Sequence, residues 1–128
     1  FETPSNMILL GKVDSQVLLA KYYSMADVTV ITSKRETFSM VCAESLCCGT
    51  PVVGFAAGAP EQIAIEKYSR FVQQGDVEQL KHAVEDVLNS KFEQNEIEKN
   101  AHIAYAKSTM TEKYIKLYNA VMHTENPE

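Results

Sequence analysis

Two glutamates, Glu36 and Glu44, stand eight positions apart around a predicted helix start. A carboxylate suits a vicinal diol, because its two oxygens accept two hydrogen bonds at once. Between the two glutamates, the backbone N–H groups of residues 38–41 fall in the first helical turn, where they have no partner within the helix. With the helix dipole, these N–H groups form a site for an anion. The spacing therefore predicts a carboxylate, an anion site and a second carboxylate, in that order.

Helix geometry sets the distances in this arrangement. Ser39 and Glu44 are five residues apart, or about 7.5 Å along a helix axis. A nucleotide sugar has the matching order of sugar, diphosphate and ribose. The distance disfavours a glycosidase pair, whose retaining form needs carboxyl groups about 5–5.5 Å apart. The spacing alone also fits a Glu36 on a surface loop and a Glu44 on an exposed helix face, so it does not assign the site.

Strands that alternate with helices would position these residues. Four apolar or β-branched runs, 6–11, 28–32, 51–55 and 69–73, are predicted strands. The alternation predicts an α/β fold, a Rossmann-like parallel sheet with helices on both faces. Such a sheet usually has six strands. We therefore expect residues 1–128 to form one partial domain whose first strands lie outside the chain.

Capping residues define the predicted helices. A helix over 15–25 would begin after Asp14, and a helix over 39–48 would be capped by Ser39 and closed by Gly49. Asp76 would open a helix over 77–89, and a polar helix over about 94–106 would follow. The pattern Thr109-x-x-Glu112 predicts a capping box at the start of the last helix.

Composition excludes several functional classes. The net charge is −5 and the basic residues are scattered, so no nucleic acid is expected as a partner. No apolar run approaches the roughly 20 residues that a membrane-spanning helix needs. The three cysteines, Cys42, Cys47 and Cys48, have the spacing of neither a disulfide nor a zinc site. Free thiols indicate a reducing cytoplasm, and the absence of an Asp-x-Asp pattern predicts no metal and no other cofactor.

The run "RETFSMVCAESLCCGTPVVGFAAGAPE" (35–61) carries a more specific signal. It resembles the C-terminal donor-binding domain of family 4 retaining glycosyltransferases, which have the GT-B fold. The family pattern is E-G-F-G-x-x-x-x-E-A, then G-x-P-V-V, then G-G-x-P-E. Glu36, Phe38 and Glu44 match the first part, Gly49 and 51–53 match the second, and 58, 60 and 61 match the third. The similarity extends from about residue 6 to the last helix.

The resemblance implies a role for each matching position. Glu36 would contact the donor sugar near the reacting centre and be the catalytic residue. Glu44 would bind the ribose, and Gly58 and Ala59 would let the backbone approach the sugar. The phosphates would bind the backbone at the helix start, at Phe38, Ser39, Met40 and Val41.

The same resemblance implies partners and a place in the cell. The donor would be a UDP-, GDP- or ADP-linked sugar. The acceptor, a glycan or a lipid, would be bound by an N-terminal domain outside this chain. Polysaccharide or glycoconjugate biosynthesis would take place in the cytoplasm, with the whole protein associated peripherally with the inner face of the membrane. This chain alone is expected to be inactive.

Two departures from the pattern leave other interpretations open. Thr37 and Ser39 stand where the family has glycines, and Ala57 replaces the first glycine of G-G-x-P-E. Each adds a side chain where the backbone would meet the ligand, and Ala57 disfavours a positive φ. One alternative is a non-catalytic nucleotide-binding or interaction domain that keeps the fold. Another is a different GT-B enzyme, such as a nucleotide-sugar epimerase.

Overall fold

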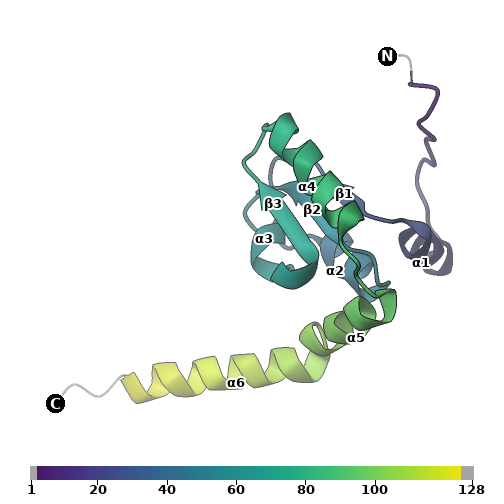
Figure 1. Cartoon of the computed structure of the whole chain (residues 1–128). Coiled ribbons are helices and arrows are strands. Elements are labelled where there is room, and N and C mark those ends of the chain that lie inside the picture. Colours follow the sequence, from purple (N-terminus) through teal and green to yellow (C-terminus); the bar gives the residue numbers. More distant parts are fainter. Residues whose placement is uncertain (1–2, 125–128) are drawn as a thin grey trace.

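Three of the predicted strands form a parallel sheet in the computed structural model, which describes residues 3–124 (Figure 1). They are β1 (Thr29–Ile31), β2 (Val52–Phe55) and β3 (Ser69–Val72). The order is β1-β2-β3, and Val53 is in register with Val30 on one side and with Arg70 on the other. The central strand β2 is buried along its whole length. The carboxyl ends of all three strands therefore meet at one edge of the sheet.

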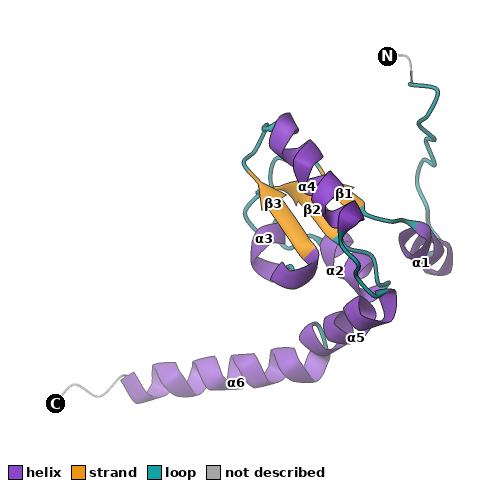
Figure 2. Ribbon diagram, viewed as in Figure 1, coloured by secondary structure: helices purple, strands orange, loops and turns teal. Residues whose placement is uncertain are grey.

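Helices lie on both faces of this sheet, as the alternating pattern predicts (Figure 2). Side chains of α4 pack on one face and side chains of α2 and α5 pack on the other. The helical elements are α1 (Gln16–Met25), α2 (Met40–Cys47), α3 (Pro60–Ile63), a 3₁₀ turn (Glu66–Tyr68), α4 (Val77–Asn89), α5 (Gln94–Ala104) and α6 (Lys107–Thr124).

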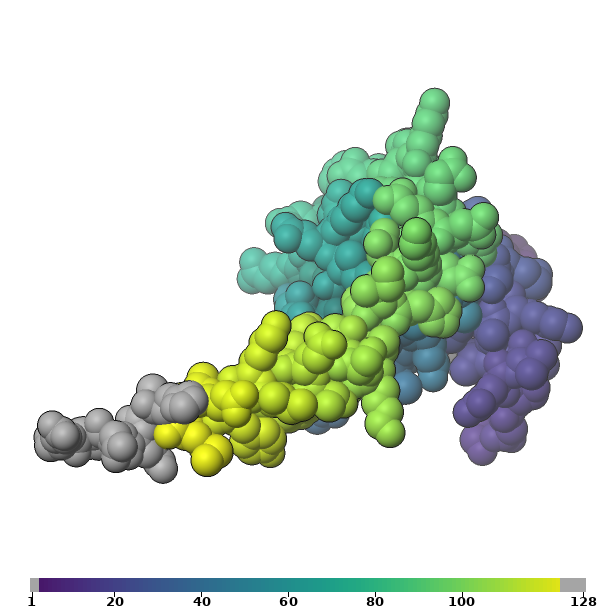
Figure 3. Space-filling view, turned by 90° about the horizontal axis from the view of Figure 1, so that it is seen from below, coloured from purple at the N-terminus to yellow at the C-terminus, as the bar shows by residue number. Residues whose placement is uncertain are grey.

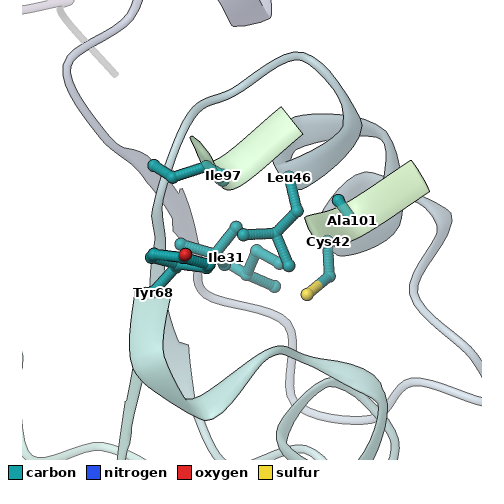
Figure 4. Close-up of a cluster of buried hydrophobic side chains, with 7 residues drawn as sticks. Ile31, Cys42, Leu46, Tyr68, Ile97 and Ala101 are labelled. Carbon is teal, nitrogen blue, oxygen red and sulfur yellow. The ribbon is translucent and has the colours of Figure 1, made fainter. Parts of the chain in front are cut away.

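Successive side chains of a strand point to opposite faces of the sheet, and this alternation divides the core into two clusters. Val52 points to the α2 and α5 face, and its neighbour Val53 points to the α4 face. The larger cluster joins β1, α2, β2 and α5 around the buried Tyr68 ring (Figure 4). Its members are Ile31, Cys42, Leu46, Val52, Tyr68, Ile97 and Ala101. This cluster fixes α2, and with it the helix start that the sequence marks as a site.

The predicted strand over 6–11 is wrong for the described structure. Residues 7–10 lie in an irregular segment, and Ile8 and Leu9 are 84% and 73% exposed. A strand needs a partner for its backbone groups, and no described strand runs beside this segment. In a six-strand sheet of order 3-2-1-4-5-6, the segment 6–11 would be the third strand and β1 the fourth. Two other strands separate these two positions. The free flank of β1 is therefore not the position that this segment would take.

Two predicted helix starts, those of α1 and α6, need correction. The α1 N-cap is Ser15, whose hydroxyl accepts from the Leu18 N–H, and not Asp14. The Thr109 hydroxyl donates to the Ile103 carbonyl from inside α6, which begins at Lys107, so the predicted capping box does not form. Asp76 caps α4 as predicted and accepts from the Gln79 N–H at 2.9 Å.

The last helix projects from the body of the molecule, away from the N-terminal segment (Figure 3). Its apolar side chains at i, i+3, i+4 and i+7 are at least half exposed: Tyr114, Leu117, Tyr118 and Val121. Across the described part of the chain, no helix combines the length and hydropathy needed to cross a membrane.

Candidate functional site

Two loops at the carboxyl edge of the sheet form the candidate site. Residues 33–38 follow β1, and residues 56–61 follow β2 and run into α3. The Glu36 N–H donates to the Ala57 carbonyl at 3.0 Å. This backbone hydrogen bond joins the two loops, which therefore lie side by side.

The first loop ends at the start of α2, where the backbone offers free donors. Within the described residues, none of the N–H groups of residues 38–41 donates a backbone hydrogen bond. Phe38, Met40 and Val41 are 42%, 59% and 41% exposed, so this helix start is open to solvent. The arrangement matches the anion site that the sequence predicts.

Ser39 departs from its expected role as a capping side chain. It occupies the N-cap position of α2, but its side chain makes no capping hydrogen bond. Its backbone is left-handed, with φ 68° and ψ 75°, the only positive φ of a non-glycine residue in the described structure. A capping serine normally has an extended backbone that turns its oxygen toward the helix N–H groups. The left-handed backbone is the conformation that a glycine adopts without strain.

The Ser39 hydroxyl is also without a partner. Ser39 is 4% exposed, and its Oγ is one of two buried side-chain oxygens in residues 3–124 that have no hydrogen-bond partner. A buried polar group without a partner costs free energy. Strain and an unsatisfied group thus coincide at the residue where the first loop meets the helix.

Glu44 lies one turn into α2, on the side that faces α1. It is half-buried, and its Oε2 accepts a hydrogen bond from the Tyr23 hydroxyl at 3.4 Å. Burial, together with the nearby Glu44 carboxylate, raises the pKa of Tyr23 to about 12. Tyr23 therefore remains a neutral donor at physiological pH and holds the carboxylate in place.

Two hollows meet at Glu44. One, of about 270 Å³, lies between α1 and α2 and includes Tyr23 and Cys48. The other, of about 550 Å³, is mostly apolar and lies between the α2 start and the helices α3, α5 and α6. It is lined by Phe38, Met40, Ala43, Glu44, Cys47, Gln62, Ile63, Ala104, Tyr105, Met110 and Lys113. Glu44 is thus beside open space, and not on a featureless helix face.

The second loop brings its backbone close to the first. Gly58 has φ 105°, and a Cβ at this position would lie 3.7 Å from the Glu36 carbonyl oxygen. Ala59 is buried, and Ala57 does not have a positive φ. The missing glycine at position 57 is therefore tolerated, because the turn is made by Gly58 alone.

The sequence did not reveal two contacts that shape the site. Glu61 accepts hydrogen bonds from the Ala57 and Gly58 N–H groups at 3.0 and 2.8 Å. A proline followed by a glutamate is a signal for a helix start, and it would have pointed to α3 and to Glu61. No local signal identifies Tyr23 as the Glu44 donor, because that contact spans 21 positions.

The described residues contain no group of three or more His, Cys, Asp and Glu placed to hold a metal ion. Cys42, Cys47 and Cys48 are free. Burial raises the pKa of Cys42 to about 12 and also raises the pKa of the other two thiols. The raised pKa values favour the protonated thiols at neutral pH, and the thiolate is the nucleophilic form.

Comparisons with known proteins find relatives that match part of this chain. The chain is 58% identical over 43 residues to D-inositol 3-phosphate glycosyltransferase of Thermomonospora curvata, and 42% identical over 48 residues to the protein of that name from Xylanimonas cellulosilytica. These matches span 34% and 38% of this chain but only 10% and 12% of those proteins.

Solved structures show the same fold. Sucrose-phosphate synthase from Thermosynechococcus elongatus matches 84% of this chain and 28% of its own, with a TM-score of 0.64 and 26% identity. HepE of Anabaena, solved in complex with UDP, matches 78% of this chain and 29% of its own, with a TM-score of 0.58 and 18% identity. The likeness confirms the α/β fold and agrees with the C-terminal half of a GT-B fold.

The family model described as "Glycosyl transferases group 1" matches residues 1–104, most of the chain. The matched range includes both loops, α2 and both glutamates. The chain therefore belongs to the group 1 glycosyl transferases.

Proposed function

We propose that this chain is the donor-binding part of a retaining glycosyltransferase and that it binds a nucleotide sugar. One observation carries the proposal: the open N–H groups at the α2 start lie between Glu36 on the first loop and Glu44 one turn along the helix. This order matches the sugar, the diphosphate and the ribose of the donor.

Each part of the site has a separate task in this proposal. The N–H groups of residues 38–41 bind the diphosphate, and the α2 dipole stabilises its charge as it leaves. Glu44 accepts hydrogen bonds from the ribose diol, and Tyr23 holds that carboxylate in place. Glu36 contacts the donor sugar, whose positive charge grows in the transition state. Gly58 and Ala59 bring the second loop up to the sugar.

The relatives support transfer of a sugar but leave its partners open. The curated relatives are named D-inositol 3-phosphate glycosyltransferases, and the UDP in the HepE structure is a nucleoside diphosphate. We propose a UDP-, GDP- or ADP-linked donor without a metal, and a glycan or lipid acceptor bound by a second domain. A cytoplasmic site at the inner membrane face would suit glycoconjugate or polysaccharide synthesis.

Titration with a panel of nucleotide sugars tests the proposal. In the intact polypeptide that contains this chain, the correct donor at 100 times its dissociation constant should stabilise the fold by about 2.7 kcal/mol. Glu44→Gln should weaken binding of the free nucleoside diphosphate about 10- to 150-fold, since hydrogen bonds to charged groups contribute roughly 1.5–3 kcal/mol. Glu36→Gln should lower turnover far more than diphosphate affinity.

A matched control and clear alternatives accompany this test. Glu78→Gln, in the first turn of α4, makes the same change of charge on a residue outside both loops and outside α2, and should alter neither quantity. If Glu44→Gln leaves diphosphate affinity unchanged, the ribose assignment is wrong. If the intact polypeptide binds the diphosphate but transfers no sugar from any donor, the alternative of a non-catalytic binding domain is correct.

A further inference from the structure

Glu61 makes two hydrogen bonds to the loop that precedes it. Its Oε2 accepts from the Ala57 N–H at 3.0 Å, and its Oε1 accepts from the Gly58 N–H at 2.8 Å. Burial opposes ionisation, but backbone N–H groups at Glu61, Ala57 and Gly58 lower the pKa of this carboxyl below its usual range. Glu61 is therefore a carboxylate at neutral pH, with each oxygen bound to one backbone donor of the second loop.

Ala57 connects this carboxylate to the first loop. Its N–H donates to Glu61, and its carbonyl accepts from the Glu36 N–H at 3.0 Å. Ala57 alone thus links the Glu61 carboxylate to the Glu36 backbone. The Glu36 side chain makes no hydrogen bond within the described residues, so its position depends on its backbone.

Apart from the Ala57 carbonyl, which accepts from Glu36, backbone hydrogen bonds fix the second loop at its ends. The Ala56 N–H donates to the Val72 carbonyl at 2.8 Å, and the Ala59 carbonyl accepts the first helical hydrogen bonds of α3. Between these anchors lies Gly58, with φ 105°. A glycine backbone is less restricted than that of other residues, so Gly58 does not by itself hold the loop in one conformation. The Glu61 carboxylate therefore supplies the other two hydrogen bonds in the middle of the loop, those at the Ala57 and Gly58 N–H groups.

We propose that Glu61 is a positioning residue for the transfer reaction: it fixes Ala57, and through Ala57 it fixes Glu36 against the donor sugar. The inference rests on the proposed function, because it needs Glu36 to act at the sugar. Loss of Glu61 would leave two N–H groups without an acceptor and release the loop. The diphosphate site on residues 38–41 would remain, since it belongs to α2 and not to the second loop.

Glu61→Gln in the intact polypeptide that contains this chain tests the proposal. A glutamine has one acceptor oxygen and an NH₂ group, so it can satisfy one of the two N–H groups and repels the other. We expect turnover to fall about 10- to 100-fold, because small misplacements of reacting groups have effects of this size. Affinity for the nucleoside diphosphate should stay within about twofold, which a general loss of structure would not allow.

Glu66→Gln is the matched control. Glu66 lies five positions away in the 3₁₀ turn and is exposed, and its carboxylate makes no hydrogen bond or ion pair within residues 3–124. The change of charge and size is identical, so turnover and diphosphate affinity should both equal those of the unmodified protein. An equal fall in turnover in both variants would overturn the proposal, because charge alone would then explain the effect.

Amide hydrogen exchange gives a second measurement that does not depend on activity. Glu61→Gln should accelerate exchange at the Ala57 and Gly58 N–H groups and also at the Glu36 N–H, which is bound to the Ala57 carbonyl. Faster exchange at 57 and 58 with an unchanged Glu36 would overturn the coupling between the loops. Glu61→Asp, which keeps the charge on a shorter side chain, should show smaller effects in the same direction.

The remaining outcomes also decide the question. Turnover and diphosphate affinity that fall together, or an affinity that rises, would overturn the proposal, because Glu61 would then act on the whole site or compete with the ligand. If the unmodified polypeptide binds no nucleoside diphosphate and transfers no sugar, the proposed function fails first. The exchange measurement would then still show whether Glu61 holds the second loop and, through it, the Glu36 N–H.

Discussion

Ser39→Gly should stabilise the fold, although it removes a side chain from the start of a helix. Ser39 has φ 68° and ψ 75°, and it is 4% exposed. Its hydroxyl is buried and has no hydrogen-bond partner. The side chain therefore adds strain and an unsatisfied polar group without making the capping hydrogen bond expected of a serine at this position.

Three contributions determine the size of the effect. A left-handed backbone costs an L-residue about 1–2 kcal/mol, and glycine avoids this cost. A buried hydroxyl without a partner costs about 1–3 kcal/mol. Glycine opposes both gains, because its freer unfolded chain disfavours folding by about 0.5–1 kcal/mol. The net change in the free energy of unfolding should be an increase of at least about 1 kcal/mol.

Urea-induced and thermal unfolding of the polypeptide that contains this chain would measure the change. An increase of 1 kcal/mol corresponds to a rise in Tm of roughly 4 °C for a domain of this size. Ser39→Ala removes the hydroxyl but keeps a Cβ in the left-handed region, so its gain should be smaller. Ser5→Gly, in the exposed N-terminal segment, is the control and should have little effect.

Two results would refute this reasoning. A neutral or destabilising Ser39→Gly would mean that the hydroxyl has a partner or that the backbone is not left-handed in solution. Equal gains for Ser39→Gly and Ser39→Ala would assign the whole effect to the hydroxyl and none to the backbone.

Two further predictions concern the sheet. Gly54→Ala should destabilise the fold by about 1–3 kcal/mol, because a Cβ there would lie 2.7 Å from the Ile31 carbonyl oxygen in the neighbouring strand. Equal urea midpoints for the variant and the unmodified chain would contradict the close approach of β1 and β2. Residues 1–128 alone should self-associate through the unpaired flank of β1 and show no transfer activity, and Val30→Lys on that strand should reduce the association. Size-exclusion chromatography would measure both forms, and a 14.3 kDa monomer at all concentrations of the unmodified chain would be the contrary result.

The sequence alone determined the features that depend on neighbouring residues. The strands β1 and β2 were predicted because the first is a β-branched run and the second an apolar run. Asp76 marks the start of α4 and Gly49 follows the end of α2, each through contacts with residues only a few positions away. The candidate site followed for the same reason, because a helix start and a glutamate one turn later form a local pattern.

Where the sequence prediction was wrong, competing local signals or a missing neighbour decided the outcome. Asp14 and Ser15 are both good caps, and the choice of Ser15 depends on where the chain turns into α1. The apolar segment 6–11 has the composition of a strand, but a strand forms only beside another strand. In the same way, Tyr114, Leu117 and Tyr118 have the spacing of an apolar helix face but are more than half exposed.

Tertiary structure decided how the site residues are held. The hydrogen bond from Glu36 to Ala57 joins two loops that are distant in sequence, and Tyr23 reaches Glu44 across the interface of α1 and α2. These contacts depend on the parallel order of β1 and β2, which brings the loop ends together at one edge of the sheet. The left-handed backbone of Ser39 has the same origin, because the chain must enter α2 from a loop whose other end is fixed to β1. Sequence spacing could place the two carboxylates along the helix, but only the packed fold could fix the loop that carries one of them.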